Sequence, residues 1–228
     1  MTTLVVIAKE CLPGRVKTRL HPPLSLEQAA ELAAASLDDT LGALAALPAT
    51  RRILAFDGVI APLAAAGYEI LPQVEGTLDL RLAAVFDACE GPTVLVGMDT
   101  PQLTSALLEP VFTDWTDDVD AWFGFANDGG FWALALNDPA GALNRGALNR
   151  GDLNRGDLIR GVPMSRSDTG ALQLKRLTDA GLRVNLLPTL TDVDTIDDAH
   201  RVAGIAPTGG FAAALAAMMA PRPKNGLR

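Results

Sequence analysis

The chain has 228 residues, of which 49% are hydrophobic, and this length suits one domain with a full hydrophobic core. The formal net charge of −8 argues against a nucleic-acid-binding surface, because such surfaces are basic. No stretch approaches the roughly 20 apolar residues that span a bilayer, and the start of the chain lacks the features of a signal peptide, so we expect a cytoplasmic protein without a membrane span.

Short β-branched runs alternate with longer Ala- and Leu-rich helical patterns, which is typical of stacked βαβ units. The expected strands lie at 5–8, 51–56, 68–71, 93–98, 119–124, 131–136 and 182–187. The expected helices lie at 26–47, 59–66, 78–89, 104–112, 169–180 and 196–202. Ser25 is the expected N-cap of the first helix. The pattern predicts an α/β protein with three layers, α/β/α, around a mostly parallel mixed sheet.

The first expected strand leads into a basic loop with the sequence KECLPGRVKTRL. Its cations are Lys9, Arg15, Lys17 and Arg19. Arg binds phosphate oxygens in a bidentate manner, Lys acts as a point charge, and ligands of open α/β sheets lie at the carboxyl ends of strands. The loop is either an oligophosphate site or a solvated basic surface, and this segment alone does not decide between the two.

The chain has two cysteines, Cys11 and Cys89, and neither belongs to a CxxC pair, so no zinc or redox motif is indicated. Cys11 lies in the basic loop, where a lowered thiol pKa is conceivable. Since no His lies close to it in sequence, we do not expect it to be catalytic.

Acidic residues follow two further expected strands. Asp99 comes directly after the strand at 93–98, where a carboxylate can hold Mg²⁺ against substrate phosphates, although it could instead cap the next helix. Asp192 and Asp194 lie in a DVDT segment, and an extended backbone would point them to opposite sides. At most one of them would then share a metal with Asp99. Asp194 or Thr195 is also well placed to cap the helix that follows.

The NDGG segment at 127–130 joins two expected strands. Asp-Gly is a strong signal for a tight turn, which accounts for the segment without any function. The functional alternative places Asp128 and the backbone of Gly129 and Gly130 beside a ligand, because glycine lets backbone amides approach closely.

The SRSDTG segment at 165–170 precedes an expected helix. Its hydroxyl groups and backbone amides could bind an anion at the helix start. Capping of the helix by Asp168 or Thr169 is the favoured interpretation.

Residues 142–161 contain four tandem five-residue units, ALNRG, ALNRG, DLNRG and DLIRG. Four units would make only about one coil of a pentapeptide β-helix, and solenoids need several stacked units, so we expect an expansion within one surface loop. The periodic arginines could form a basic flap, to which we assign no role. We expect one domain over residues 1–206 that contains this insertion, followed by a C-terminal helix and tail over residues 207–228.

Five motifs in this order resemble one family. AKxxxPGxVKTRL, GMDTPQL, NDGGFW, GVPMSxxxTG and DVDTxxD resemble the glycosyltransferase-A-like bacterial transferases of the nucleotide-diphospho-sugar transferase superfamily. The first and last motifs also resemble the guanylyltransferases that activate phospholactate or phosphoenolpyruvate. The resemblance covers residues 4–202 apart from the repeats, and it implies a Rossmann-like nucleotide-diphospho-sugar transferase fold.

The resemblance also implies site residues. They are Lys9, Arg15, Lys17 and Arg19 for the nucleotide phosphates, Asp99 and Asp194 (or Asp192) for Mg²⁺ or Mn²⁺, Asp128, Gly129 and Gly130 for the acceptor or sugar, and Ser165 and Thr169 for a loop that closes over the substrate. Lys17 and Arg19 would stabilise the leaving phosphate and Asp128 would be the base, so these three are the expected catalytic residues.

The resemblance leaves the reaction open. A glycosyltransferase with a nucleotide-sugar donor and a small-molecule acceptor is the first hypothesis, supported by the DGGFW segment. A nucleotidyltransferase that joins an NTP to a phosphorylated small molecule is the alternative, supported by the VKTRL loop and by Asp99-Thr100-Pro101, which lacks the second carboxylate of an Asp-x-Asp motif. An inactive nucleotide-binding protein is the third. The base, the sugar, the acceptor and the oligomeric state, including a homodimer, stay open.

Overall fold

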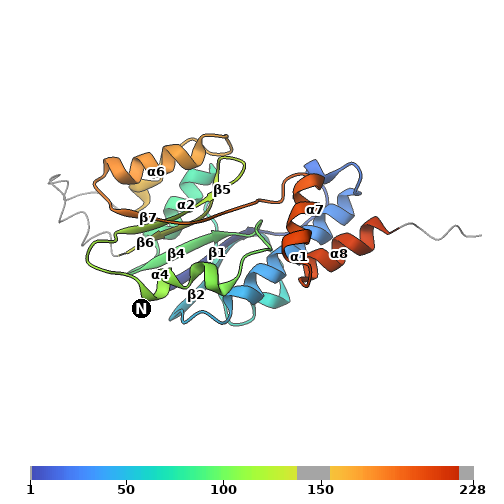
Figure 1. Ribbon diagram of the computed structural model, residues 1–228, viewed down its shortest axis with the longest axis horizontal. Helices are drawn as coiled ribbons and strands as arrows, with labels where there is room; N and C mark the ends of the chain where they lie inside the picture. Colours follow the sequence, from blue (N-terminus) through green and yellow to red (C-terminus); the bar gives the residue numbers. More distant parts are fainter. Residues whose placement is uncertain (1, 138–154, 221–228) are drawn as a thin grey trace, which may run out of the picture.

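The structure is a computed structural model of the chain, in which residues 2–137 and 155–220 are described. A seven-stranded sheet with the order β3-β2-β1-β4-β6-β5-β7 runs through its centre (Figure 1). The strands are β1 (Thr3–Lys9), β2 (Arg51–Asp57), β3 (Glu69–Pro72), β4 (Thr93–Gly97), β5 (Ala121–Ala126), β6 (Phe131–Leu136) and β7 (Val184–Leu190). Strand β6 is antiparallel to β4 and β5, and the other paired strands are parallel. The expected mixed, mostly parallel sheet is confirmed.

Helices cover both faces of the sheet. They are α1 (Leu26–Leu44), α2 (Leu78–Asp87), α3 (Ser105–Leu108), α4 (Pro110–Thr113), α6 (Thr169–Asp179), α7 (Ile196–Ile205) and α8 (Gly210–Met219), with 3-10 turns η1 (Thr18–Leu20), η2 (Leu63–Ala65) and η3 (Arg155–Leu158). Helices α1, α3 and α4 lie on one face, and α2 and α6 lie on the other (Figure 1). No helix in the described part of the chain has the length and apolar character to cross a membrane.

The two faces of β1 feed two separate cores. Leu4 and Val6 pack with Leu41 of α1 on one face, while Val5 packs with Phe86 of α2 on the other. This alternation follows from the two-residue period of a strand, and all five side chains are almost fully buried. Burial of each such side chain contributes roughly 1.5–3 kcal/mol, so β1 is held firmly from both sides.

A smaller core at the end of the sheet anchors the basic loop. Leu20 is fully buried against Val202 of α7 and Phe211 of α8. Helix α8 is fixed to α1 by Asp39, whose carboxylate accepts hydrogen bonds from the backbone N–H groups of Gly210 (2.9 Å) and Phe211 (2.8 Å). The residues next to Leu20 are thus held in place by this core.

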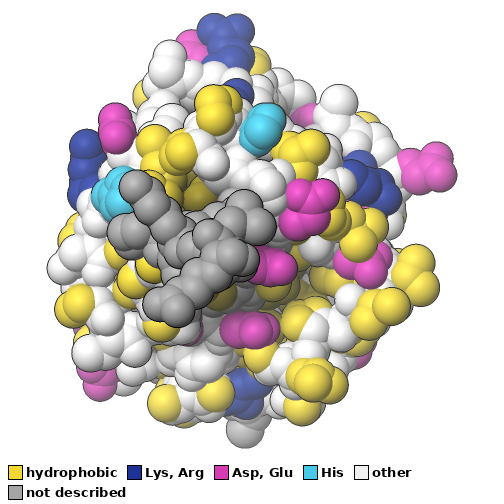
Figure 2. All heavy atoms as spheres, turned by 90° about the vertical axis from the view of Figure 1, so that its right-hand side faces the viewer, with side chains coloured by type: hydrophobic (Ala, Val, Ile, Leu, Met, Phe, Trp, Pro, Cys, Tyr) yellow, Lys and Arg dark blue, Asp and Glu magenta, His cyan; other side chains and the backbone are white. Residues whose placement is uncertain are grey.

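Seen from the side of α7 and α8, acidic and hydrophobic side chains intermingle on the surface (Figure 2).

Two expected helices differ from those observed. Residues 59–66 form only the 3-10 turn Leu63–Ala65. Residues 104–112 form two single turns, α3 and α4, divided at Glu109. Pro110 causes this division, because proline has no N–H to donate to the preceding turn and its ring crowds that turn.

The repeat insertion falls largely on residues 138–154, outside the described residues. Its last two arginines are described, and both are engaged. Arg155 donates to the carbonyl oxygens of Cys89 and Gly91, and Arg160 pairs with Asp87 and Asp157. These two arginines do not form the basic flap that the repeat suggested.

Candidate functional site

A cavity of about 920 Å³ opens at the carboxyl edge of the sheet. Strands β1, β4, β5 and β7 end at this edge and antiparallel β6 begins there. Of the candidate residues, the cavity is lined by Lys9, Lys17, Arg19, Asp99, Asp128, Gly130, Ser165, Thr169, Asp192 and Asp194. Arg15 and Gly129 are the two candidates that do not line it. Segments far apart in the sequence therefore meet in one site.

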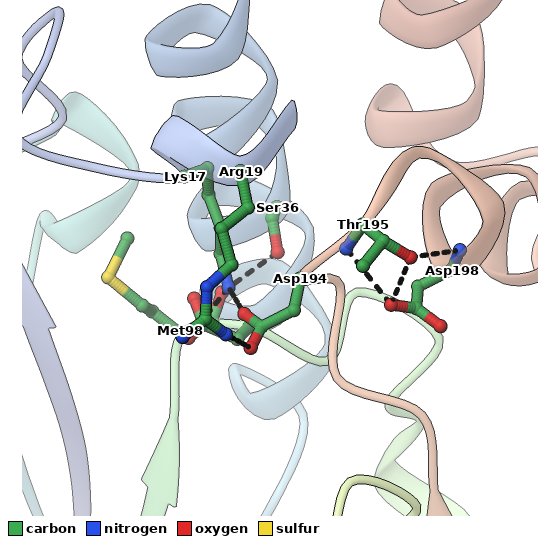
Figure 3. A network of polar contacts seen from close by, with 8 residues as sticks. Lys17, Arg19, Ser36, Met98, Asp194, Thr195 and Asp198 are labelled. Carbon is green, nitrogen blue, oxygen red and sulfur yellow. Dashed lines mark hydrogen bonds and ion pairs between the residues drawn. The ribbon is translucent and has the colours of Figure 1, made fainter. Parts of the chain in front are cut away.

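Lys17 lies at the centre of an ion-pair network (Figure 3). Its Nζ is 3.0 Å from Asp99 Oδ2 and 3.0 Å from Asp194 Oδ1, and its side chain is only 10% exposed. Arg19 Nη1 lies 3.1 Å from Asp194 Oδ2, but its side chain is 76% exposed. Exposed ion pairs contribute little to stability, so Lys17 is the cation that the fold holds in place.

The backbone on either side of Lys17 is pinned by apolar residues. Val16 is buried against Ala30 and Ala33 of α1, and Leu20 is buried in the core under α7 and α8. Lys17 itself has φ 45° and ψ 37°, the left-handed conformation. The sequence V-K-T-R-L thus buries its apolar residues and directs Lys17 to the acids.

Hydrogen bonds hold the two acidic loops together. Val193 N donates to Asp99 O at 3.0 Å, and Gln102 Nε2 donates to Thr191 O at 2.8 Å. Ser36 of α1 donates its hydroxyl to Met98 O at 2.8 Å, which ties the residue before Asp99 to the helix (Figure 3). The carboxylates of Asp99 and Asp194 are consequently fixed near each other by their own backbones.

Neither Asp99 nor Asp194 caps a helix. Thr195 is the N-cap of α7, where its Oγ1 accepts from Asp198 N and Asp198 Oδ2 accepts from Thr195 N at 2.9 Å. Helix α3 begins at Ser105 with Thr104 at the N-cap position. The capping alternatives for Asp99 and Asp194 are therefore wrong, and both carboxylates are left to face the cavity.

The network shifts the pKa values of two of its members. Burial alone would lower the pKa of Lys17, but attraction to Asp99 and Asp194 outweighs it and raises the pKa above the usual value. Burial, with repulsion from Asp99 and Asp128, raises the pKa of Asp192 to about 7. Asp192 Oδ1 is buried and has no hydrogen-bond partner among the described residues. Asp192 thus binds a proton more readily than an exposed aspartate does.

The NDGG turn contacts residues 167–170, which follow the repeats in sequence. Gly129 has φ +90°, and a Cβ there would lie 1.9 Å from Ser167 O. Gly170 N donates to Gly129 O at 2.8 Å. Gly129 is therefore required by close contact between two loops, and it does not line the cavity. Asp128 does line the cavity, and its Oδ1 accepts from Gly130 N at 2.7 Å.

The 163–169 loop is shaped by Thr169. The buried Thr169 hydroxyl donates to Pro163 O at 2.9 Å and accepts from Arg166 N at 3.1 Å. Asp168 stands at the N-cap position of α6 without a capping hydrogen bond and pairs with Arg166 at 2.8 Å. The expected capping role of Asp168 is wrong.

The loop also contains a strained residue that faces the cavity. Ser165 has φ 58°, and it and Lys17 are the described non-glycine residues with positive φ. Such a conformation costs on the order of 1–3 kcal/mol and tends to occur at functional sites. Both strained residues line the same cavity.

In the basic loop, Arg15 does not line the cavity, and the surroundings of Cys11 agree with the expectation that it is not catalytic. Arg15 is exposed and lies outside the cavity lining. Burial and the charge of Asp99 raise the pKa of the Cys11 thiol to about 11, so the thiol is protonated at neutral pH instead of being activated.

Sequence reasoning missed two polar residues of the cavity, Gln73 and Arg81. Gln73 Nε2 donates to Ala8 O at 2.8 Å and to Ala55 O at 2.9 Å, and Arg81 pairs with Asp57 at 2.9 Å. The position of Gln73 in the sequence could have identified it, because Gln73 directly follows the carboxyl end of β3, where ligands of open α/β sheets bind.

The donor atoms at this site suit a hard divalent cation. Mg²⁺ is usually bound through one or two carboxylates together with substrate phosphates. Asp99 and Asp194 converge on one point, and the buried Asp192 Oδ1 lacks a partner. Within residues 2–137 and 155–220, no three acidic, His or Cys side chains gather closely enough to hold an ion alone, so phosphate oxygens would complete the ligand set.

Solved structures with the same fold include transferases. The chain resembles a provisionally named nucleotide-diphospho-sugar transferase from Desulfovibrio desulfuricans G20, with a TM-score of 0.77, 23% identity and coverage of 94% of this chain and 93% of that one. A cytidylyltransferase from Leptospira borgpetersenii gives a TM-score of 0.53 at 10% identity over 95% and 93% of the two chains. The fold implied by the motifs is confirmed.

Sequence comparison places the chain in a family without giving it an activity. No curated protein matches the sequence. Residues 38–166, more than half of the chain, match the family described as uncharacterized protein conserved in bacteria (DUF2064), and the protein belongs to that family.

Proposed function

We propose that the protein is a metal-dependent transferase that takes a nucleotide-activated substrate, with a nucleotide-sugar as the donor and a small molecule as the acceptor. The observation that carries this proposal is the position of Lys17 and Arg19 beside Asp99 and Asp194 at the carboxyl edge of the sheet. Ligands of open α/β sheets bind at this edge. A cavity of about 920 Å³ is within the usual size range of small-molecule sites.

The residues of the cavity divide into two groups. Lys17 and Arg19 would contact the diphosphate, where their positive charge stabilises the negative charge that grows as the bond to the sugar breaks. When bound at Asp99 and Asp194, with Asp192 as the alternative to Asp194, Mg²⁺ or Mn²⁺ would supply further neutralisation of the diphosphate.

The second group lies toward the acceptor. Asp128 is the candidate base for the acceptor hydroxyl, since it lines the cavity and is fixed by Gly130 N. Ser165 projects from the loop that Thr169 shapes, and this loop would limit access of water to the bound donor. The two groups together would place the donor between the basic loop and the 163–169 loop.

A second function is favoured by one specific observation. Asp99 is followed by Thr100 and Pro101, so the site lacks an Asp-x-Asp pair, and the buried Lys17 would suit a triphosphate equally well. A nucleotidyltransferase that joins an NTP to a phosphorylated small molecule would use the same cations, with pyrophosphate as the leaving group.

One assay separates these functions. The protein is incubated with Mg²⁺ and either a panel of nucleotide-sugars or a panel of NTPs, while the melting temperature and the released products are measured. We expect nucleotide-sugars to raise the melting temperature and to release nucleoside diphosphate slowly without pyrophosphate. Release of pyrophosphate from an NTP would establish the second function, and no thermal shift with any nucleotide would leave the protein without the proposed activity.

A further inference from the structure

We propose that Lys17 is an exchangeable counter-ion. Its ammonium neutralises Asp99 and Asp194 until a divalent cation arrives with the nucleotide phosphates, and the lysine side chain then turns into the cavity toward those phosphates. This inference rests on the proposed function and adds to it a coupling between metal binding and phosphate binding.

The geometry requires an exchange, because both cations need the same oxygens. Lys17 Nζ lies 3.0 Å from Asp99 Oδ2 and 3.0 Å from Asp194 Oδ1. A Mg²⁺ ion takes oxygen ligands at about 2.0–2.1 Å, so an ion held by these two oxygens would compete with the ammonium for them and lie in close contact with it. Two positive charges at such a distance repel strongly in a partly buried site. Lys17 and the metal therefore occupy the position in turn.

The exchange needs movement of the Lys17 side chain alone. Val16 and Leu20 bury the backbone on either side of it, which keeps the Cα at the cavity wall. The four-carbon stem of lysine carries a point charge that can be directed to different partners. Since Lys17 already lines the cavity, rotation of its side chain brings the ammonium to a bound phosphate without movement of the loop.

The charges of the cluster explain why a lysine occupies this place. Asp99 and Asp194 both lie 3.0 Å from Lys17 Nζ, and Asp128 and Asp192 line the same cavity. Without a cation among them, these carboxylates would repel one another in a partly desolvated site. The Lys17 ammonium supplies that cation in the nucleotide-free protein. When the substrate binds, the divalent cation takes its place beside the carboxylates.

The test measures Mn²⁺ affinity of the nucleotide-free protein by electron paramagnetic resonance. In Lys17→Met we expect Mn²⁺ to bind at least about tenfold more tightly than in the unmodified protein, because no ammonium has to be displaced. In the same variant we expect inorganic pyrophosphate, titrated with Mn²⁺ present, to bind about tenfold more weakly, because a phosphate contact is lost. These opposite changes are the signature of exchange.

Control variants isolate the ion pairs from general electrostatics. Lys175→Met removes a positive charge from the exposed surface of α6, where Lys175 pairs with Asp179 and does not line the cavity, and it should leave Mn²⁺ affinity within about twofold. Lys17→Arg keeps the charge and should retain weak Mn²⁺ binding. If Lys17→Met does not fold, Lys17→Gln provides the same comparison with a side chain that can still hydrogen-bond to the acids.

The outcomes separate this inference from the proposed function. Unchanged or weaker Mn²⁺ binding in Lys17→Met and Lys17→Gln, with intact binding of nucleotide-sugars by the unmodified protein, would overturn the exchange and leave the function standing. If the unmodified protein binds neither nucleotide nor Mn²⁺-pyrophosphate, both fail. Binding of nucleotide without any Mn²⁺ binding by any variant would overturn both the exchange and the metal dependence of the proposed function.

Discussion

At the scale of single residues, Asp192 is an acid of the site whose ionisation is opposed by its surroundings. Its pKa of about 7 lies above the usual value of 3.8 because of burial and neighbouring acids. The folded state therefore binds a proton more readily than the unfolded chain does, and stability falls as the pH rises from about 4 to about 7. Above that range the ionised Asp192 opposes folding fully.

Asp192→Asn should stabilise the metal-free protein at pH 8. Removal of the buried charge should raise the free energy of unfolding by on the order of 2–4 kcal/mol at that pH. The gain should be small near pH 4, where Asp192 is protonated in the folded state and about half-protonated in the unfolded chain. Urea denaturation in EDTA at several pH values measures this. Asp179→Asn, which changes an exposed acid on α6, is the control, and an equal gain at all pH values would contradict the assigned pKa.

Asp99→Asn tests the proposed metal site. The substitution keeps the shape of the side chain and removes the charge that pairs with Lys17. We expect metal-dependent affinity for a nucleoside diphosphate to fall by about 100-fold, roughly the loss of one charge-assisted contact. Calorimetric titration with and without Mg²⁺ provides the measurement. Affinity and metal dependence equal to those of the unmodified protein would remove Asp99 from the site.

At the scale of elements, the NDGG turn and the 163–169 loop are in close contact. A Cβ on Gly129 would lie 1.9 Å from Ser167 O, so the two loops can meet only because this residue is glycine. Gly67 has nearly the same φ, +88°, but has nothing within 4 Å of its Cβ position. A substitution at Gly67 therefore measures the cost of the backbone conformation alone. A substitution at Gly129 adds the cost of the clash with Ser167.

Gly129→Ala should destabilise the protein by about 1–3 kcal/mol more than Gly67→Ala, because only the first adds a steric clash. Both variants pay the cost of positive φ for alanine, on the order of 1–2 kcal/mol. Chemical denaturation of the two variants in parallel gives the comparison. Equal destabilisation would mean that the 163–169 loop does not dock on the NDGG turn.

The sequence predicts the elements better than their contacts. Periodicity and caps located the strands and the long helices, and Ser25 forms its expected capping box with Gln28. The predictions of the two short helices at 59–66 and 104–112 were wrong, and Pro110 interrupts the second of them. The role of Gly129 could not be predicted, because it depends on the approach of a loop about forty residues further along the chain.

At the scale of the whole molecule, the topology of the sheet assembles the site. Lys17 and Asp194 are 177 residues apart in sequence and meet because the chain after β7 crosses to the loop that follows β4, where Val193 N bonds to Asp99 O. Parallel strands place their carboxyl ends on one edge, which is why the motif order predicted most of the cavity. The direct pairing of Lys17 with both acids could not be predicted, because side-chain partners are set by the packed loops.

The measurement that tests the central claim most directly is a crystal structure with Mg²⁺ and a nucleoside diphosphate. We predict that the diphosphate lies against Lys17 and Arg19, and that the metal bridges its oxygens to Asp99 and to Asp194 or Asp192. A nucleotide bound elsewhere, or one bound in this cavity with Lys17 still between the two carboxylates and no metal beside it, would contradict the proposed site.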